Sequence, residues 1–106
     1  MSYRVMRIFV LFDLPVGTVE ERRSAAKYRK FLVKSGFMML QESVYCKLAL
    51  NSTAGNLVVE SLKKNSPEAG SVIVLRITEK QFQNMEFLVG NMKQDVLHSD
   101  ERIVVI

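Results

Sequence analysis

Residues 6–15 read MRIFVLFDLP, an apolar run that ends abruptly on a carboxylate, Asp13. The run is rich in β-branched and aromatic side chains and is too short for a stable helix, so it predicts a β-strand with both faces buried. Pro15 and Gly17 predict a turn directly after it. We expect this strand at the centre of the fold, and Asp13 at its end is the first candidate for a functional residue.

An amphipathic helix is predicted to follow the turn. Thr18 and Glu21 have the T-x-x-E spacing of a capping box, and Gly36 offers the left-handed backbone that ends a helix. At about 100° per residue the apolar side chains of this segment share one face, which predicts that the helix packs on the strand. Arg22 and Arg29 fall on the border between that face and solvent, where a long side chain lies along the body of the protein. The opposite, solvent-facing stripe is basic and consists of Arg23, Lys27, Lys30 and Lys34.

The rest of the pattern completes an α+β plan. We expect strands at 37–41 and 43–50 that form a hairpin or a bulged pair, and then a helix that is capped near Asn51 and stops at Pro67. A central strand at 71–78, a short capped helical turn at 78–84, a short strand at 85–89 and a terminal strand at 102–106 are expected to follow. The resulting order βαββαβ predicts the ferredoxin-like fold, an antiparallel sheet with two helices on one face. Residues 1–106 are predicted to form one domain, with a core at 1–90 and a C-terminal extension at 91–106.

Two features of this plan predict a homodimer. The sheet face away from the two helices has no helix to cover it, and the terminal strand RIVVI at 102–106 would be exposed as a free edge. Pairing of two copies through that face, with each terminal strand added to the partner's sheet, removes both problems.

The charge distribution points to a polyanionic partner. Fifteen basic and eleven acidic residues give a formal net charge of +4, and residues 22–34 carry six of the basic residues without one acid. Binding to nucleic acid is driven largely by neutralisation of phosphates with release of counterions, so a nucleic acid is one partner that this run suits. A solvated helix face is the alternative, and from the charge run alone neither is preferred.

The composition argues against several other classes of protein. No run of about 18 apolar residues exists to span a membrane, and no secretory signal is seen, so we expect a cytoplasmic protein without a membrane partner. The single cysteine, Cys46, and the single histidine, His98, do not make an internal disulfide or a zinc site. No phosphate-binding glycine motif occurs.

Asp13 itself has two interpretations. An aspartate two residues before a proline is frequently only a turn former. A carboxylate that is held at the end of a buried strand and partly desolvated is also where metal ligands and catalytic acids are placed. Magnesium commonly uses one or two carboxylates and keeps several waters, so a two-fold axis close to Asp13 would build a site from two copies of one residue. Such a metal could polarise a phosphodiester while nearby arginines neutralise charge on the phosphate.

The chain resembles a known family. The apolar first strand that ends on Phe12-Asp13, the basic helix after it, the Ser43-Val44-Tyr45 start of the third strand and the chain length together resemble the CRISPR-associated endoribonuclease family, the smaller of the two universal adaptation proteins, in its type II branch. This resemblance implies a homodimeric phosphodiesterase that depends on magnesium or manganese, acts on single-stranded RNA or double-stranded DNA, and serves the acquisition of new spacers in antiviral defence. It implies that Asp13 is catalytic and binds the metal, with Asp13 of the second copy across the dimer axis.

The resemblance also implies roles for other residues. Phe12 stands where many relatives have tyrosine, and it lacks the hydroxyl that could donate a hydrogen bond to phosphate. Ser43 matches the family's serine and would join Asp13 and Phe12 in the catalytic site, whereas the family's first-helix arginines fit Arg22 or Arg23. The nucleic-acid contacts would come from the basic residues of the helix, Arg22, Arg23, Lys27, Arg29, Lys30 and Lys34.

A second, non-catalytic role is the alternative that the family implies. In that role the dimer bridges two dimers of the CRISPR integrase and lies against duplex DNA, with the basic face on the phosphate backbone and the C-terminal strand on the integrase. A third interpretation, a ferredoxin-like regulatory domain, shares the fold but gives the basic stripe no task.

Overall fold

The computed structural model describes residues 5–91, in which four strands form an antiparallel sheet with the order β2-β3-β1-β4. This is the strand order of the ferredoxin-like fold, so the predicted fold class is confirmed. The elements are β1 (Met6–Asp13), α1 (Val19–Lys34), β2 (Met38–Gln41), β3 (Val44–Ala49), α2 (Ser52–Lys64), β4 (Ser71–Thr78) and α3 (Glu79–Gln83). The terminal strand that the sequence predicts at 102–106 lies outside the described residues.

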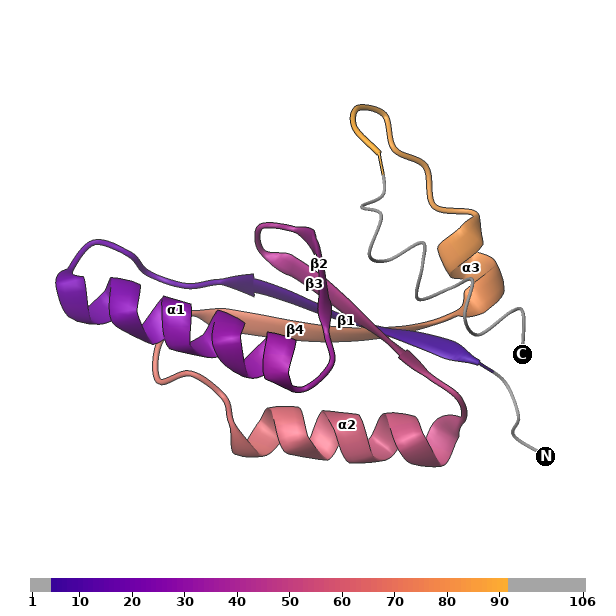
Figure 1. The fold of residues 1–106 in the computed structure, drawn as a ribbon, viewed down its shortest axis with the longest axis horizontal. Coiled ribbons are helices and arrows are strands. Elements are labelled where there is room, and N and C mark those ends of the chain that lie inside the picture. Colours follow the sequence, from indigo (N-terminus) through magenta and orange to yellow (C-terminus); the bar gives the residue numbers. More distant parts are fainter. Residues whose placement is uncertain (1–4, 92–106) are drawn as a thin grey trace.

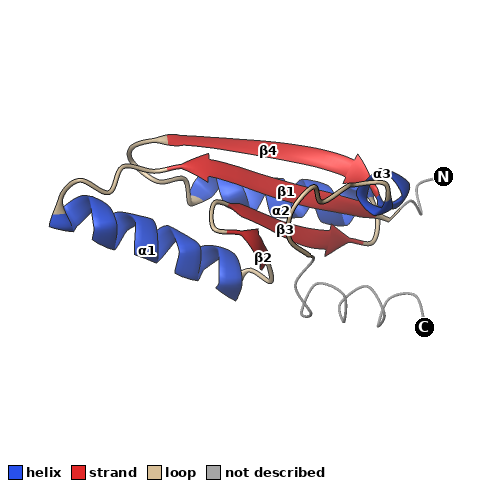
Figure 2. Cartoon of the chain, turned by 90° about the horizontal axis from the view of Figure 1, so that it is seen from above, coloured by secondary structure: helices blue, strands red, loops and turns tan. Residues whose placement is uncertain are grey.

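β1 occupies the centre of the sheet because its side chains are apolar on both faces. It pairs with β3 on one side and with β4 on the other (Figure 2). Ile8, Val10 and Phe12 belong to the core that α1 and α2 cover. Phe9 and Leu11 belong to the cluster on the opposite face, as the alternation of side chains along a strand requires.

Local sequence signals position the two long helices. The Thr18 hydroxyl accepts a hydrogen bond from the N–H of Glu21, and the Glu21 carboxylate accepts one from the N–H of Thr18 at 3.0 Å, so the predicted capping box begins α1. Asn51 caps α2 by accepting from the N–H of Ala54 at 2.8 Å. Across residues 5–91, no helix is long and apolar enough to cross a membrane.

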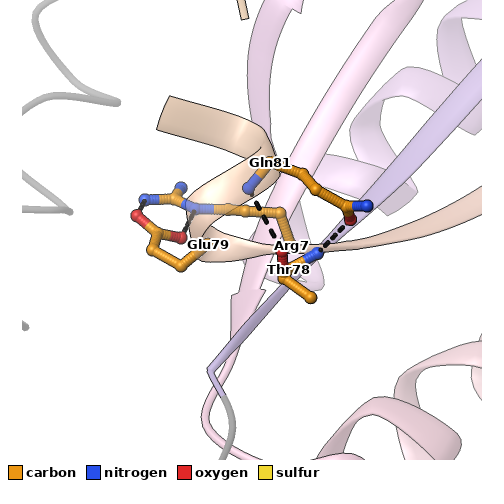
Figure 3. A network of polar contacts seen from close by, with 4 residues as sticks. All are labelled: Arg7, Thr78, Glu79 and Gln81. Atoms are coloured by element: carbon orange, nitrogen blue, oxygen red, sulfur yellow. Dashed lines mark hydrogen bonds and ion pairs between the residues drawn. The ribbon is translucent and has the colours of Figure 1, made fainter. Parts of the chain in front are cut away.

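The opposite face of the sheet is covered in part by α3, which lies on the other side of the sheet from α2 (Figure 1). The expectation that no helix covers this face is therefore wrong near α3. Arg7, only 2% exposed, fixes α3 there, because its Nε donates to Glu79 Oε1 at 2.9 Å (Figure 3). The Arg7 guanidinium also lies 4.2 Å from the ring centre of Phe82. Thr78 and Gln81 add a second capping box at the start of α3.

β4 and the segment after α3 differ from the sequence-based prediction. The sequence predicts a central strand at 71–78, but within the described residues β4 pairs only with β1 and forms an edge. The ferredoxin-like order places the fourth strand outermost, which leaves Ile73 59% and Leu75 48% exposed. No strand forms at 85–89, because Met85 and Phe87 pack against the face of the sheet, where no strand edge offers hydrogen bonds.

Candidate functional site

Asp13 ends β1 and pairs with Ser71 at the start of β4. Gly70 lies against this strand end with a φ of 93°, and a Cβ added at Gly70 would stand 2.5 Å from the carbonyl oxygen of Asp13. The strand end is therefore closely packed through its backbone. The Asp13 side chain is exposed in the single chain, so the partial desolvation that the sequence predicts for it is absent here.

The β2–β3 hairpin brings Ser43 to the same place. The N–H of Phe12 donates to the carbonyl oxygen of Ser43 at 3.0 Å, which fixes the hairpin turn beside the end of β1. The Phe12 ring is only 7% exposed and packs edge-on against Tyr28, whose burial raises the pKa of the Tyr28 hydroxyl. The structure thus gives Phe12 a packing role beneath the site.

A groove of about 990 Å³ opens between α1 and the β2–β3 hairpin, next to the end of β1. Its α1 side carries three of the predicted nucleic-acid-binding residues, Arg29, Lys30 and Lys34. Asp13 and Ser43 line the same groove. Asp13, Ser43 and three cations, which the sequence indicates separately, therefore line one groove.

Three other predicted residues lie away from this groove. Arg22 donates to the carbonyl oxygen of Val16 at 3.3 Å and so holds the loop between β1 and α1. Arg23 and Lys27 line a separate groove of about 570 Å³ between α1 and the loop after α2. Neither of the arginines that the family resemblance suggests, Arg22 or Arg23, lines the groove that contains Asp13.

Sequence reasoning missed several residues that complete the groove. Glu42 adds a second carboxylate to its lining, and Val33 and Met39 add apolar surface. Val33 could have been identified from the sequence, because it is an apolar residue outside the core face of the helix. In the structure it is 58% exposed. Gly70 was predictable only as a turn residue, because its contact with Asp13 depends on how β4 meets β1.

Oxygen atoms of the groove lining are the ligands available to the metal that the family resemblance implies. Within residues 5–91, no group of three or more His, Cys, Asp or Glu side chains lies together where it could hold a metal ion. One chain offers a hard cation the carboxylate of Asp13, with Ser43 lining the same groove. Because magnesium accepts one or two carboxylates and retains waters, oxygen ligands of this kind fit it.

The fold and the groove define a small ferredoxin-like protein in which Asp13 and three cations line one groove, and the cations suit ligands that contain phosphate. Residues 6–85 match the family model described as "CRISPR associated protein Cas2", and the chain belongs to this family. The family that the sequence resembles is thereby confirmed.

Curated relatives and a solved structure agree with this assignment. The chain is 50% identical over 101 residues to the "CRISPR-associated endoribonuclease Cas2" of Treponema denticola. This alignment covers 95% of this chain and 100% of that protein. It is 44% identical over 101 residues to the protein of the same name from Streptococcus mutans serotype c, with 95% and 93% of the two chains covered. A solved structure described as "Crystal structure of cas2" matches with a TM-score of 0.55 and 22% identity, over 85% of this chain and 92% of that one, which supports the fold.

Proposed function

We propose that this protein is an endonuclease that cleaves phosphodiester bonds of nucleic acid and that it acts in the cytoplasm as part of a CRISPR system. The curated relatives named above are called endoribonucleases, so single-stranded RNA is the first proposed substrate and double-stranded DNA the second. The observation that carries this proposal is the groove that Asp13 shares with Arg29, Lys30 and Lys34. Cations there hold phosphate, and the carboxylate offers an oxygen ligand to a metal.

The proposed active form is a homodimer in which the Asp13 carboxylates of two copies face each other. Asp13 is exposed at the end of β1, between the groove beside α1, which it lines, and Leu11 of the open sheet face. The neighbouring strand leaves Ile73 59% and Leu75 48% exposed, and contiguous exposed apolar surface favours association. A second copy related by two-fold symmetry would bring its own Asp13 to the same axis.

Magnesium or manganese is the proposed cofactor, held by the Asp13 carboxylates of the two copies. When bound, such an ion polarises the phosphodiester and lowers the pKa of a bound water. Arg29 and Lys30 hold the phosphate and offset the negative charge that develops on it. The Ser43 hydroxyl, at the hairpin turn, donates a hydrogen bond to a phosphate oxygen.

The test of this function is cleavage of labelled single-stranded RNA by the wild type and by Asp13→Asn, matched for oligomeric state, with magnesium, with manganese and with EDTA. The substitution keeps the size of the side chain and removes its charge. We expect metal-dependent cleavage to fall at least about a hundredfold, which corresponds to about 2.7 kcal/mol in the barrier. Thermal unfolding of both proteins controls for folding, because the Asp13 side chain is exposed.

Two results would contradict the proposal in different ways. Equal cleavage by the two proteins removes Asp13 from the reaction, and cleavage in EDTA removes the metal. Absence of cleavage by the wild type on both RNA and duplex DNA removes nuclease activity altogether.

A second candidate function is favoured by the basic residues on the other flank of α1. Arg23 and Lys27 are exposed and line the groove that does not contain Asp13. We propose that this flank lies against the backbone of duplex DNA while the dimer bridges copies of the CRISPR integrase during the acquisition of new spacers. This role needs no cleavage, so it is compatible with duplex binding by the Asp13→Asn protein.

A further inference from the structure

The cations of α1 divide between the two flanks of the helix. Arg29, Lys30 and Lys34 line the groove that contains Asp13, whereas Arg23 and Lys27 line the groove beside the loop after α2. Arg29 is half-buried, and the other four side chains are exposed. A half-buried arginine at the border of a groove is restrained by the surface along its side chain, and its planar guanidinium matches phosphate geometry. Arg29 is therefore the best-positioned phosphate contact on this helix.

The lining of the same groove also contains exposed apolar surface. Val33 is 58% exposed, Val16 is 55% exposed, and Met39 of β2 is half-buried. Duplex nucleic acid keeps the faces of its bases stacked inside the helix, so it has little apolar surface to place against these side chains. A single strand exposes its base faces, which gain from apolar contact while its phosphates meet cations. The combination of an apolar lining and a cationic rim therefore favours a single strand.

We propose that this groove binds a single strand of nucleic acid next to Asp13, with Arg29 as its main phosphate contact and Val33 against a base. Lys30 and Lys34 lie four residues apart on the rim, about 6 Å along the helix axis, so they contact successive parts of the strand backbone. This proposal rests on the proposed nuclease function for the choice of nucleic acid as ligand. It adds the residues that distinguish the substrate strand from a duplex.

The experiment measures the affinity of the full chain for a fluorescent oligouridine strand and for duplex DNA, in EDTA so that no metal-dependent cleavage occurs. Arg29→Gln should weaken single-strand binding about tenfold and reduce the slope of log K against log salt concentration by about 0.7, as the loss of one phosphate contact requires. Val33→Gln should weaken single-strand binding about threefold without changing that slope, because no phosphate contact is lost. Lys64→Gln is the matched control, since it removes the same charge from an exposed position at the end of α2.

Duplex affinity separates a groove for a single strand from general electrostatic attraction. On the duplex, Arg29→Gln and Lys64→Gln should have the same small effect. The proposal is overturned if Arg29→Gln loses no more single-strand affinity than Lys64→Gln, or if it loses duplex affinity to the same extent as single-strand affinity. Because binding is measured without metal, a wild type that binds the strand but never cleaves it would refute the nuclease function and still support the groove.

Discussion

Asp13 is held at the end of β1 by its backbone rather than by contacts of its side chain. Its carbonyl oxygen lies 2.5 Å from the position that a Cβ on Gly70 would take, and Asp13 pairs with Ser71, so the ends of the two strands meet. The carboxylate is therefore presented to solvent from a fixed position. A metal-binding carboxylate that two copies of the chain share, as proposed for Asp13, must be accessible to the second copy and must be held rigidly.

Gly70→Ala tests this backbone contact, with Gly90→Ala as its matched control. Both glycines have a φ of 93°, but nothing lies within 4 Å of a Cβ built on Gly90. Gly90→Ala should lower the free energy of unfolding by about 1 kcal/mol through backbone strain alone. Gly70→Ala should lower it by about 3 kcal/mol, because the added methyl group also displaces Asp13 or Leu14. Urea unfolding measures both variants, and equal losses would show that the strand end is not closely packed.

At the scale of elements, the helices and strands that depend on residues close together in the sequence were predictable, and those that depend on distant residues were not. The caps at Thr18 and Asn51 depend on residues three positions apart, so the sequence pattern was enough to locate both helices. The place of β4 was not predictable in the same way, because an apolar, β-branched run suits an edge strand with one open face as well as a central strand. The candidate site has the same limit. The cations of α1 are visible in the sequence, but the packing of the hairpin decides that Arg29 faces Asp13's groove and Arg23 does not.

The attachment of α3 through Arg7 makes a second prediction at this scale. Glu79→Ala removes the carboxylate that pairs with a guanidinium only 2% exposed, and we expect a loss of about 2 kcal/mol, less than for a fully buried pair because Glu79 is 23% exposed. Arg7→Met combined with Glu79→Ala should regain part of this loss, since it removes the buried charge and keeps a chain of similar length. Urea unfolding of the single and double variants measures the difference.

An exposed ion pair provides the control for this cycle. Glu60→Ala breaks the pair with Lys63 on α2, whose side chains are 60% and 69% exposed, and it should change stability by less than about 0.5 kcal/mol. A double variant no more stable than Glu79→Ala would mean that the buried charge of Arg7 is not the source of the loss.

Within residues 5–91, the exposed apolar surface and the cations of α1 lie on opposite faces of the sheet. The open face of the sheet continues from Leu75 to the segment after α3, where Leu88 is 95% and Val89 is 90% exposed. The cations proposed to bind nucleic acid lie on α1, which packs on the other face (Figure 1). In the proposed homodimer a second copy covers the apolar surface and leaves α1 exposed, so dimerisation and binding of nucleic acid do not compete.

Subunit mixing tests most directly whether the catalytic site is shared by two copies of Asp13. Wild type and Asp13→Asn are unfolded together and refolded, so that dimers form at random, and cleavage of single-stranded RNA with magnesium is measured at a fixed total concentration. A site that needs Asp13 from both copies is active only in wild-type pairs, so an equal mixture should retain about a quarter of the wild-type rate. A mixture that retains about half, in proportion to the wild-type chains present, would contradict the shared site and place one complete site on each chain.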